Sequence, residues 1–194
     1  WQEIFRPATL ASGRSYPYGF GWFLESPRQQ VRYHSGSHLG FGSYYSRFLG
    51  PQLAIIVLAN RSGVNREEIV RHLAGMIDPT LVPAPARPIK DSAPAVTKRL
   101  RRMLEPQEIP SSELGAFAMS DRPYRISVYS KARASLGALQ ELRLFAIDQV
   151  GDERVHIYRA RFTGGIADVN LALGTDDRIQ ALGLSATERW DAPL

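Results

Sequence analysis

Two histidines in one short segment, His34 and His38, have the widest chemical range of any side chains here, because imidazole can donate, accept or bind metal near neutral pH. Their spacing of four residues binds zinc when both lie on one helix. Here the first is flanked by strand-forming residues and the second by a glycine loop, so we expect no zinc pair. The chain has no cysteine, which excludes thiolate metal sites. Gly40 and Gly42 lack the third glycine of a nucleotide loop, and we expect no metal and no other cofactor.

The segments around these histidines have the composition of β-strands. Aromatic and β-branched residues between Gly, Pro and Ser turns predict strands at residues 18–24, 31–34, 42–48 and 53–59. Asn65 with Glu68 three residues later predicts a capped helix over residues 65–77. We expect one apolar face of this helix to pack on the sheet. That face consists of Ile69, Val70, Leu73, Met76 and Ile77.

A proline-rich segment divides the chain. We interpret residues 81–94 as a linker between a first part at 1–80 and a second domain at 95–194. The second domain should begin with helices at 95–105, 112–118 and 124–135. Strands at 141–149, 154–163, 167–173 and 178–186 should follow, joined by short turns. Helices followed by a four-stranded antiparallel meander indicate an α+β fold.

The net charge of +5 comes partly from a basic cluster. Its members are Lys98, Arg99, Arg101 and Arg102. Because apolar residues recur at helical spacing between them, we interpret the cluster as the solvated side of an amphipathic helix and expect no nucleic-acid partner. The apolar runs fall far short of the roughly 20 residues that a membrane-spanning helix needs, so we expect no membrane span.

The order of motifs in residues 18–61 resembles the serine β-lactamase and DD-peptidase superfamily, in the branch that also contains esterases and D-aminopeptidases. The matching pieces are YGFGW at 18–22, His34-Ser35-Gly36, Gly40-Phe41, the hydrophobic strand ending at Asn60, and the helix at 65–77. In that branch an HxG motif replaces the KTG motif of other members on the strand that walls the active site. The resemblance covers about the first 80 residues, which correspond to the last part of the family's hydrolase domain.

The resemblance implies a role for three residues in acyl transfer. Such chemistry needs a donor near the nucleophile, clearance for substrate along the strand, and a backbone N–H aimed at the developing oxyanion. By resemblance His34 supplies the donor, Gly36 the clearance and the N–H of Ser37 half of the oxyanion hole, with Ser35 as a further binding residue. The substrate would be a small acyl compound: an amide, an ester or a β-lactam.

The family's nucleophile and proton relay are missing from this chain. No serine is followed by lysine at the third position, and no tyrosine or serine is followed by asparagine at the second. The chain also opens on tryptophan, so we expect a C-terminal fragment of a hydrolase that is inactive alone. We expect its partner to be the missing N-terminal part of the hydrolase domain or another copy of the chain. The resemblance implies a bacterial protein in the periplasm or secreted.

The second domain resembles, less specifically, the cone-shaped α+β roll of nuclear transport factor 2 and ketosteroid isomerase. The resemblance rests on residues 135–139, 155–162 and 175–184. It implies a pocket between helices and curved sheet, with Tyr158, His156 and Asp168 as candidate binding residues. The alternative function for the chain is therefore a non-catalytic ligand-binding or dimerisation module. An isomerase would need a buried carboxylate beside a tyrosine donor, and we see no convincing pair.

Overall fold

The computed structural model describes residues 2–24, 31–61, 64–82, 86–105, 109–115, 134–187 and 190 of the 194-residue chain. The chain forms two compact units, Trp1–Ala84 and Pro85–Leu194. The division falls inside the proline-rich segment at 81–94. Each unit combines antiparallel sheet with few helices, so the protein has the α+β architecture.

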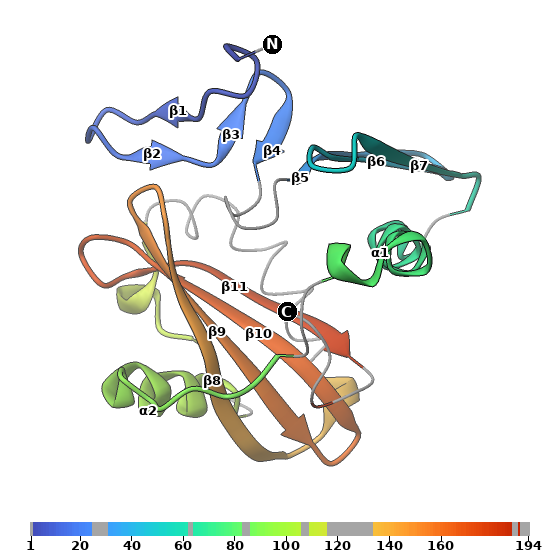
Figure 1. Ribbon diagram of the computed structural model, residues 1–194. Helices are drawn as coiled ribbons and strands as arrows, with labels where there is room; N and C mark the ends of the chain where they lie inside the picture. Colours follow the sequence, from blue (N-terminus) through green and yellow to red (C-terminus); the bar gives the residue numbers. More distant parts are fainter. Residues whose placement is uncertain are drawn as a thin grey trace. The chain divides into compact units, whose positions relative to one another are not determined.

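The described residues of the first unit contain an antiparallel sheet of five strands in the order β3-β4-β5-β6-β7 (Figure 1). The strands are β3 (Tyr18–Gly19), β4 (Trp22–Leu24), β5 (Val31–His38), β6 (Phe41–Phe48) and β7 (Leu53–Ala59). Two short strands, β1 (Ala8–Thr9) and β2 (Ser15–Tyr16), pair separately. The segment 18–24, predicted as one strand, is instead a tight hairpin. It turns at Gly21, whose φ of 80° lies in the left-handed region that favours glycine.

Helix α1 (Arg66–Ile77) packs on one face of this sheet. The side chain of Asn65 accepts a hydrogen bond from the backbone N–H of Glu68, as the capping pattern predicts. It also donates one through Nδ2 to the Glu68 carboxylate. Val70 and Ala74 are buried against the sheet. The prediction that the apolar face of this helix is buried is wrong for most of its members. The helix contacts the sheet through Val70 and Ala74, and the other apolar residues stay at the surface. The exposed members are Ile69, Leu73, Met76 and Ile77. A 3-10 turn, η1 (Pro79–Leu81), follows the helix.

The second unit is built on a four-stranded antiparallel meander in the order β11-β10-β9-β8 (Figure 1). The strands are β8 (Leu139–Val150), β9 (Glu153–Phe162), β10 (Gly165–Leu173) and β11 (Ile179–Thr187). Each of the four predicted strands is present within a few residues of its expected bounds. Register shifts occur twice along β8, and such bulges bend a strand.

Helix α2 (Pro94–Met103) is the first helix of this unit, as the sequence predicts. The predicted helix at 112–118 is wrong where it is described: a 3-10 turn, η2 (Ser111–Glu113), leads into Leu114, which forms a parallel bridge with Ile179. The carbonyls of Pro110 and Ser111 accept hydrogen bonds from the N–H groups three residues later and close the 3-10 turn, and the N–H of Gly115 then donates to the carbonyl of Ile179. Of the predicted helix at 124–135, residues 124–133 lie outside the described residues.

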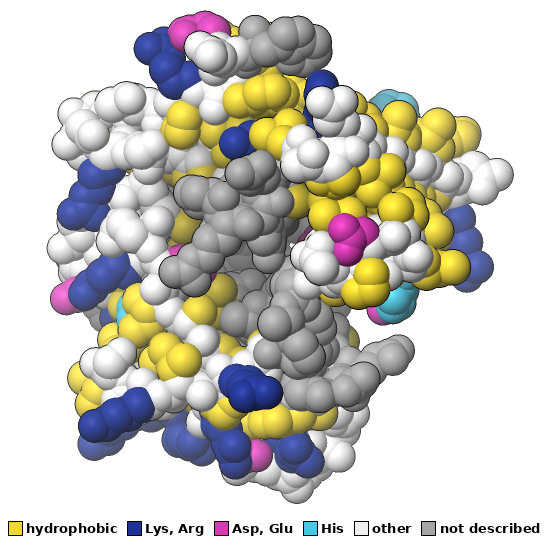
Figure 2. All heavy atoms as spheres, viewed as in Figure 1, with side chains coloured by type: hydrophobic (Ala, Val, Ile, Leu, Met, Phe, Trp, Pro, Cys, Tyr) yellow, Lys and Arg dark blue, Asp and Glu magenta, His cyan; other side chains and the backbone are white. Residues whose placement is uncertain are grey.

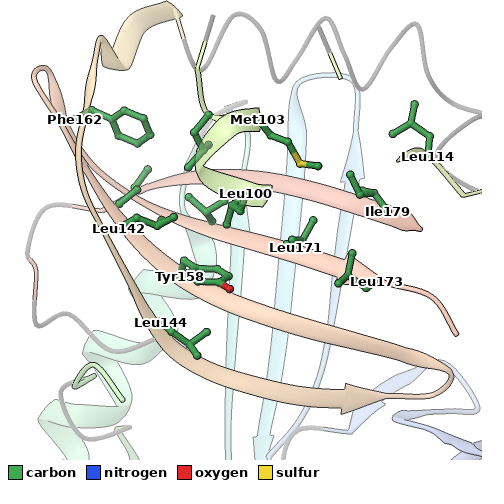
Figure 3. Packing of buried hydrophobic residues seen from close by; sticks show 14 residues of the cluster. Leu100, Met103, Leu114, Leu142, Leu144, Tyr158, Phe162, Leu171, Leu173 and Ile179 are labelled. Carbon is green, nitrogen blue, oxygen red and sulfur yellow. The ribbon is translucent and has the colours of Figure 1, made fainter. Parts of the chain in front are cut away.

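The core of the second unit lies between α2 and one face of the meander. Figure 3 shows Leu100 and Met103 of α2 pointing at that face, where Leu142, Leu171 and Tyr158 lie. The basic side chains of α2 are on its other side: Lys98 and Arg101 are exposed, whereas Arg99 pairs with Glu113. The linker also contributes, because the backbone N–H of Ile89 donates to the carbonyl of Leu144 in β8. No helix in the described part of the chain is long and apolar enough to cross a membrane.

Candidate functional site

The candidate active-site residues lie in the second half of β5, next to the β5–β6 hairpin. Residues directly opposite each other in an antiparallel pair share a face, so the register assigns each side chain to a side of the sheet. His34 and Gly36 pair with Tyr45 and Ser43, and all four belong to the face opposite α1. Ser35 and Ser37 pair with Tyr44 and Gly42 on the α1 side. The structure therefore places His34 and Gly36 on one face, and the two serines on the other.

This half of β5 has a strand partner on one side only, within the described part of the chain. β4 pairs with Arg32 and Tyr33, and β6 pairs with the whole of β5. Residues 34–38 consequently present one open backbone edge. An open edge can accept an extended peptide or amide-containing ligand by strand addition, because its N–H and C=O groups lack a ladder partner on that side.

Gly36 lies closely against its neighbour on β6. A Cβ built at Gly36 would lie 2.5 Å from the Oγ of Ser43, closer than any ordinary contact. The missing side chain therefore leaves the sheet surface flat between His34 and the hairpin.

A shallow pocket of about 590 Å³ lies at the hairpin end of the sheet. Its polar groups come from Ser37, His38, Ser43 and Asn60, and Phe41, Leu58 and Ala59 add apolar surface around Gly36 and Gly42. The pocket is open to solvent rather than enclosed. The described residues therefore form one side of a candidate binding site and leave the other side open to solvent.

His34 is exposed, and one nitrogen of its ring is engaged. The hydroxyl of Tyr18 lies 3.1 Å from Nε2 of His34, across the β3–β4 hairpin. The ring of Phe23 stacks beside the imidazole with centroids 5.8 Å apart. Sequence reasoning found Tyr18 only as part of a motif, because its contact with His34 depends on the hairpin at Gly21.

Arg66 is a second residue that sequence reasoning missed. Its guanidinium covers the α1 side of Gly42, where an added Cβ would meet it, and Gly42 lines the pocket. Nη1 of Arg66 donates to the carbonyl of Val64, while Nε is buried without a partner among the described residues. The side chain brings a positive charge next to the pocket. An arginine in the first turn of a helix carries no sequence signal for this position.

The structure brings together two of the three candidates in the second unit. Tyr158 and His156 lie two residues apart on β9 and face α2, with rings stacked at 6.4 Å. Both are buried, and the Tyr158 hydroxyl hydrogen-bonds Oγ1 of Thr97 at 2.9 Å. Burial raises the pKa of Tyr158 and lowers the pKa of His156. Nδ1 of His156 has no hydrogen-bond partner within the described ranges.

Asp168 lies on the opposite face of the same sheet. Its carboxylate accepts two hydrogen bonds from the guanidinium of Arg159, one of 2.6 Å from Nε and one of 3.0 Å from Nη2. Arg159 also donates to the carbonyl of Trp190. Arg159 is fully buried and is stacked over Phe145. Asp168 therefore neutralises a buried cation and is not placed to act with Tyr158.

Neither unit shows a metal-binding cluster in the residues that the structure describes. Comparisons with family models, curated proteins and solved structures found no match.

Proposed function

We propose that the first unit supplies the substrate-binding strand of a serine hydrolase that transfers acyl groups from amides, esters or β-lactams to water. The observation that carries the proposal is the open edge of residues 34–38, with His34 and Gly36 on one face of the strand. A carbonyl held along that edge would meet backbone N–H donors, which are the groups that stabilise an oxyanion. The side chain of His34 would add a polar contact beside it.

In this proposal, the nucleophile and its base belong to a part of the protein outside these 194 residues. Two exposed apolar surfaces of the first unit support it. On the His34 face of the sheet, Ile56 and Leu58 of β7 are 61% and 77% exposed. On α1, the side chains of Ile69, Leu73, Met76 and Ile77 are also exposed, and Figure 2 shows hydrophobic atoms at the surface over this region, on the right.

These surfaces flank the same sheet edge. β7 is the last strand of the order among the described residues, and its outer edge has no partner there. Exposed apolar side chains lie on both faces of the sheet next to this edge. Such an edge can pair with a further strand, and additional helices could cover the apolar side chains. We propose that the missing N-terminal part of the hydrolase domain provides them. Another copy of this chain is the alternative occupant.

The experiment begins with the coding sequence upstream of residue 1. A serine followed by lysine at the third position is expected there, together with a tyrosine or serine followed by asparagine at the second. The complete protein should then form an acyl-enzyme with a fluorescent penicillin or with a fluorophosphonate. Mass spectrometry should place the label on a serine outside the 194 residues. An upstream sequence without these motifs, or a label within the 194 residues, would refute the proposal.

The role of β5 is tested by His34→Ala in that complete protein. Losing one donor at the carbonyl should slow acylation by about 100-fold. His72→Ala is the matched control, because His72 is an exposed histidine on α1 and should leave the rate unchanged. Equal rates for both variants would return His34 to a purely structural role.

The second unit is in this proposal an accessory domain with the roll of the nuclear transport factor 2 type. The curved meander with α2 across one face supports that assignment. The side of the sheet that would line a pocket is filled by α2, and Leu100 and Tyr158 are fully buried there. A packed interior favours an assembly role over ligand binding. A crystal structure of the full chain with α2 away from this face would contradict it.

A further inference from the structure

The contact between Tyr18 and His34 engages one ring nitrogen of an exposed histidine. The two residues are 16 positions apart and come from β3 and β5, with β4 between these strands in the sheet. Their 3.1 Å contact joins a hydroxyl to Nε2. The nitrogen that carries the proton in a neutral imidazole is decided by the hydrogen bond that the other nitrogen makes.

Aromatic stacking holds both partners. Phe23 meets the ring of Tyr18 edge-on at 4.7 Å and stacks beside His34 at 5.8 Å. It is itself stacked on Tyr33 at 5.2 Å, and Tyr33 is stacked on Tyr44 at 5.5 Å. Tyr44 is buried in the core of the unit. The rings of Tyr18, Phe23 and His34 are therefore connected through Tyr33 to the interior of the unit. The imidazole is exposed but its orientation is constrained.

We propose that Tyr18 is a positioning residue that donates its hydroxyl proton to Nε2 of His34 and thereby keeps the imidazole proton on Nδ1. In this arrangement Nδ1–H becomes the donor of the HxG strand. It has no partner among the described residues, so it is available to a carbonyl or carboxylate oxygen of a ligand at the open edge. The inference rests on the proposed function only for the identity of that ligand.

The tautomer can be measured on the 194-residue chain itself, without any hydrolase activity. Long-range proton–nitrogen NMR spectra distinguish protonated from unprotonated ring nitrogens. At a pH where imidazole is neutral, His34 should show an unprotonated Nε2 and a protonated Nδ1. In Tyr18→Phe that pattern should shift toward protonated Nε2. His38, four residues along the same strand, is the internal reference and should not change.

Tyr16→Phe is the matched control variant. Tyr16 lies in β2, is exposed, and loses the same hydroxyl two residues before Tyr18. It should leave the His34 spectrum unchanged. A protonated Nε2 on His34 in the unmodified chain would overturn the proposal. So would a spectrum that is identical in Tyr18→Phe.

A second measurement uses the complete hydrolase. Tyr18→Phe should lower the acylation rate about tenfold, the size expected when one orienting hydrogen bond is lost. In a His34→Ala background the same change should have no further effect, because the residue acts through His34. Additive losses would overturn the positioning role. A correct tautomer pattern in a protein that forms no acyl-enzyme would instead refute the proposed function and leave the positioning role of Tyr18 standing.

Discussion

His156 is the residue whose surroundings in the fold conflict most with its chemistry. It is buried on β9 beside Leu171 of β10, and among the described residues Nδ1 has no partner in good hydrogen-bond geometry, although the backbone of Arg154 and Leu171 lies close to the ring. Burial is the main cause that lowers its pKa, and the charge of Arg154 adds to this. Hydrogen bonding to the backbone of Arg154 and Leu171 and the charge of Asp177 act in the opposite direction without cancelling the effect of burial. A histidine in such a site is stable only as the neutral imidazole.

The second unit should therefore lose stability in mild acid. The unfolded chain binds a proton at the ordinary histidine value of 6.5, while the folded chain resists it. Stability is therefore complete above pH 6.5 and falls as the pH decreases toward the lowered pKa of the folded state. Urea unfolding monitored through amide resonances of β9 and β10 should show this decrease. His156→Phe should remove much of it, whereas His72→Gln, at an exposed position, should not.

Gly36 and Ser43 should be coupled in stability. Gly36→Ala places a methyl group 2.5 Å from the Ser43 Oγ and should destabilise the first unit by about 1 kcal/mol, the lower end for overpacking. Adding Ser43→Ala removes the obstructing oxygen and should recover most of the loss. Chemical denaturation of both variants measures the difference. A double variant as unstable as Gly36→Ala would mean that the clash is not with Ser43.

At the scale of elements, β7 and α1 each present apolar residues to two different environments. Ile55 of β7 is buried against α1, and the adjacent Ile56 is exposed on the opposite face. On α1, Val70 is buried and Met76 is 82% exposed. Both elements are therefore more apolar than their present burial requires.

Substitutions on β7 test this division directly. Ile56→Lys with Leu58→Lys should keep the fold and reduce self-association, because both side chains already face solvent. Ile55→Lys should unfold the unit, since it would bury an unpaired charge. Light scattering and circular dichroism separate the two outcomes. Unfolding of the Ile56 and Leu58 variant would show that these side chains are packed in solution.

The cap of α1 offers a further prediction. Asn65→Ala removes the oxygen that accepts from the N–H of Glu68, and this should cost about 1 kcal/mol of unfolding free energy. Asn60→Ala, at an exposed asparagine that caps no helix, should be close to neutral. Thermal unfolding of the two variants gives the comparison.

The sequence predicted the helices and strands better than it predicted which residues they bring into contact. The strands of the meander and the cap at Asn65 follow from local patterns, because turn residues and periodicity are local properties. The apolar side chains of α1 were assigned to a single buried face, although the tertiary packing uses only Val70 and Ala74. The contact of Tyr18 with His34 and the separation of Asp168 from Tyr158 depend on hairpin geometry and strand register. A one-residue change in register reverses every such assignment.

At the scale of the whole molecule, the chain should be folded and catalytically silent. It carries the strand residues of the proposed site without a serine–lysine nucleophile, so its remaining donors have no tetrahedral intermediate to stabilise. Nitrocefin and p-nitrophenyl acetate should be hydrolysed no faster than in buffer. Saturable turnover that survives repurification and disappears in a serine variant of this chain would contradict this.

β5 is an interior strand in its first half and an edge strand in its second, because β4 ends its pairing at Tyr33. The same strand should therefore show two rates of amide hydrogen exchange. Amides at Arg32 and Tyr33, which have strand partners on both sides, report on opening of the whole sheet, whereas some of those at 34–38 exchange directly with water. A ligand that completes the edge would slow only the second group. Amide exchange at residues 34–38 would then report whether a ligand is bound, even in a chain that performs no reaction.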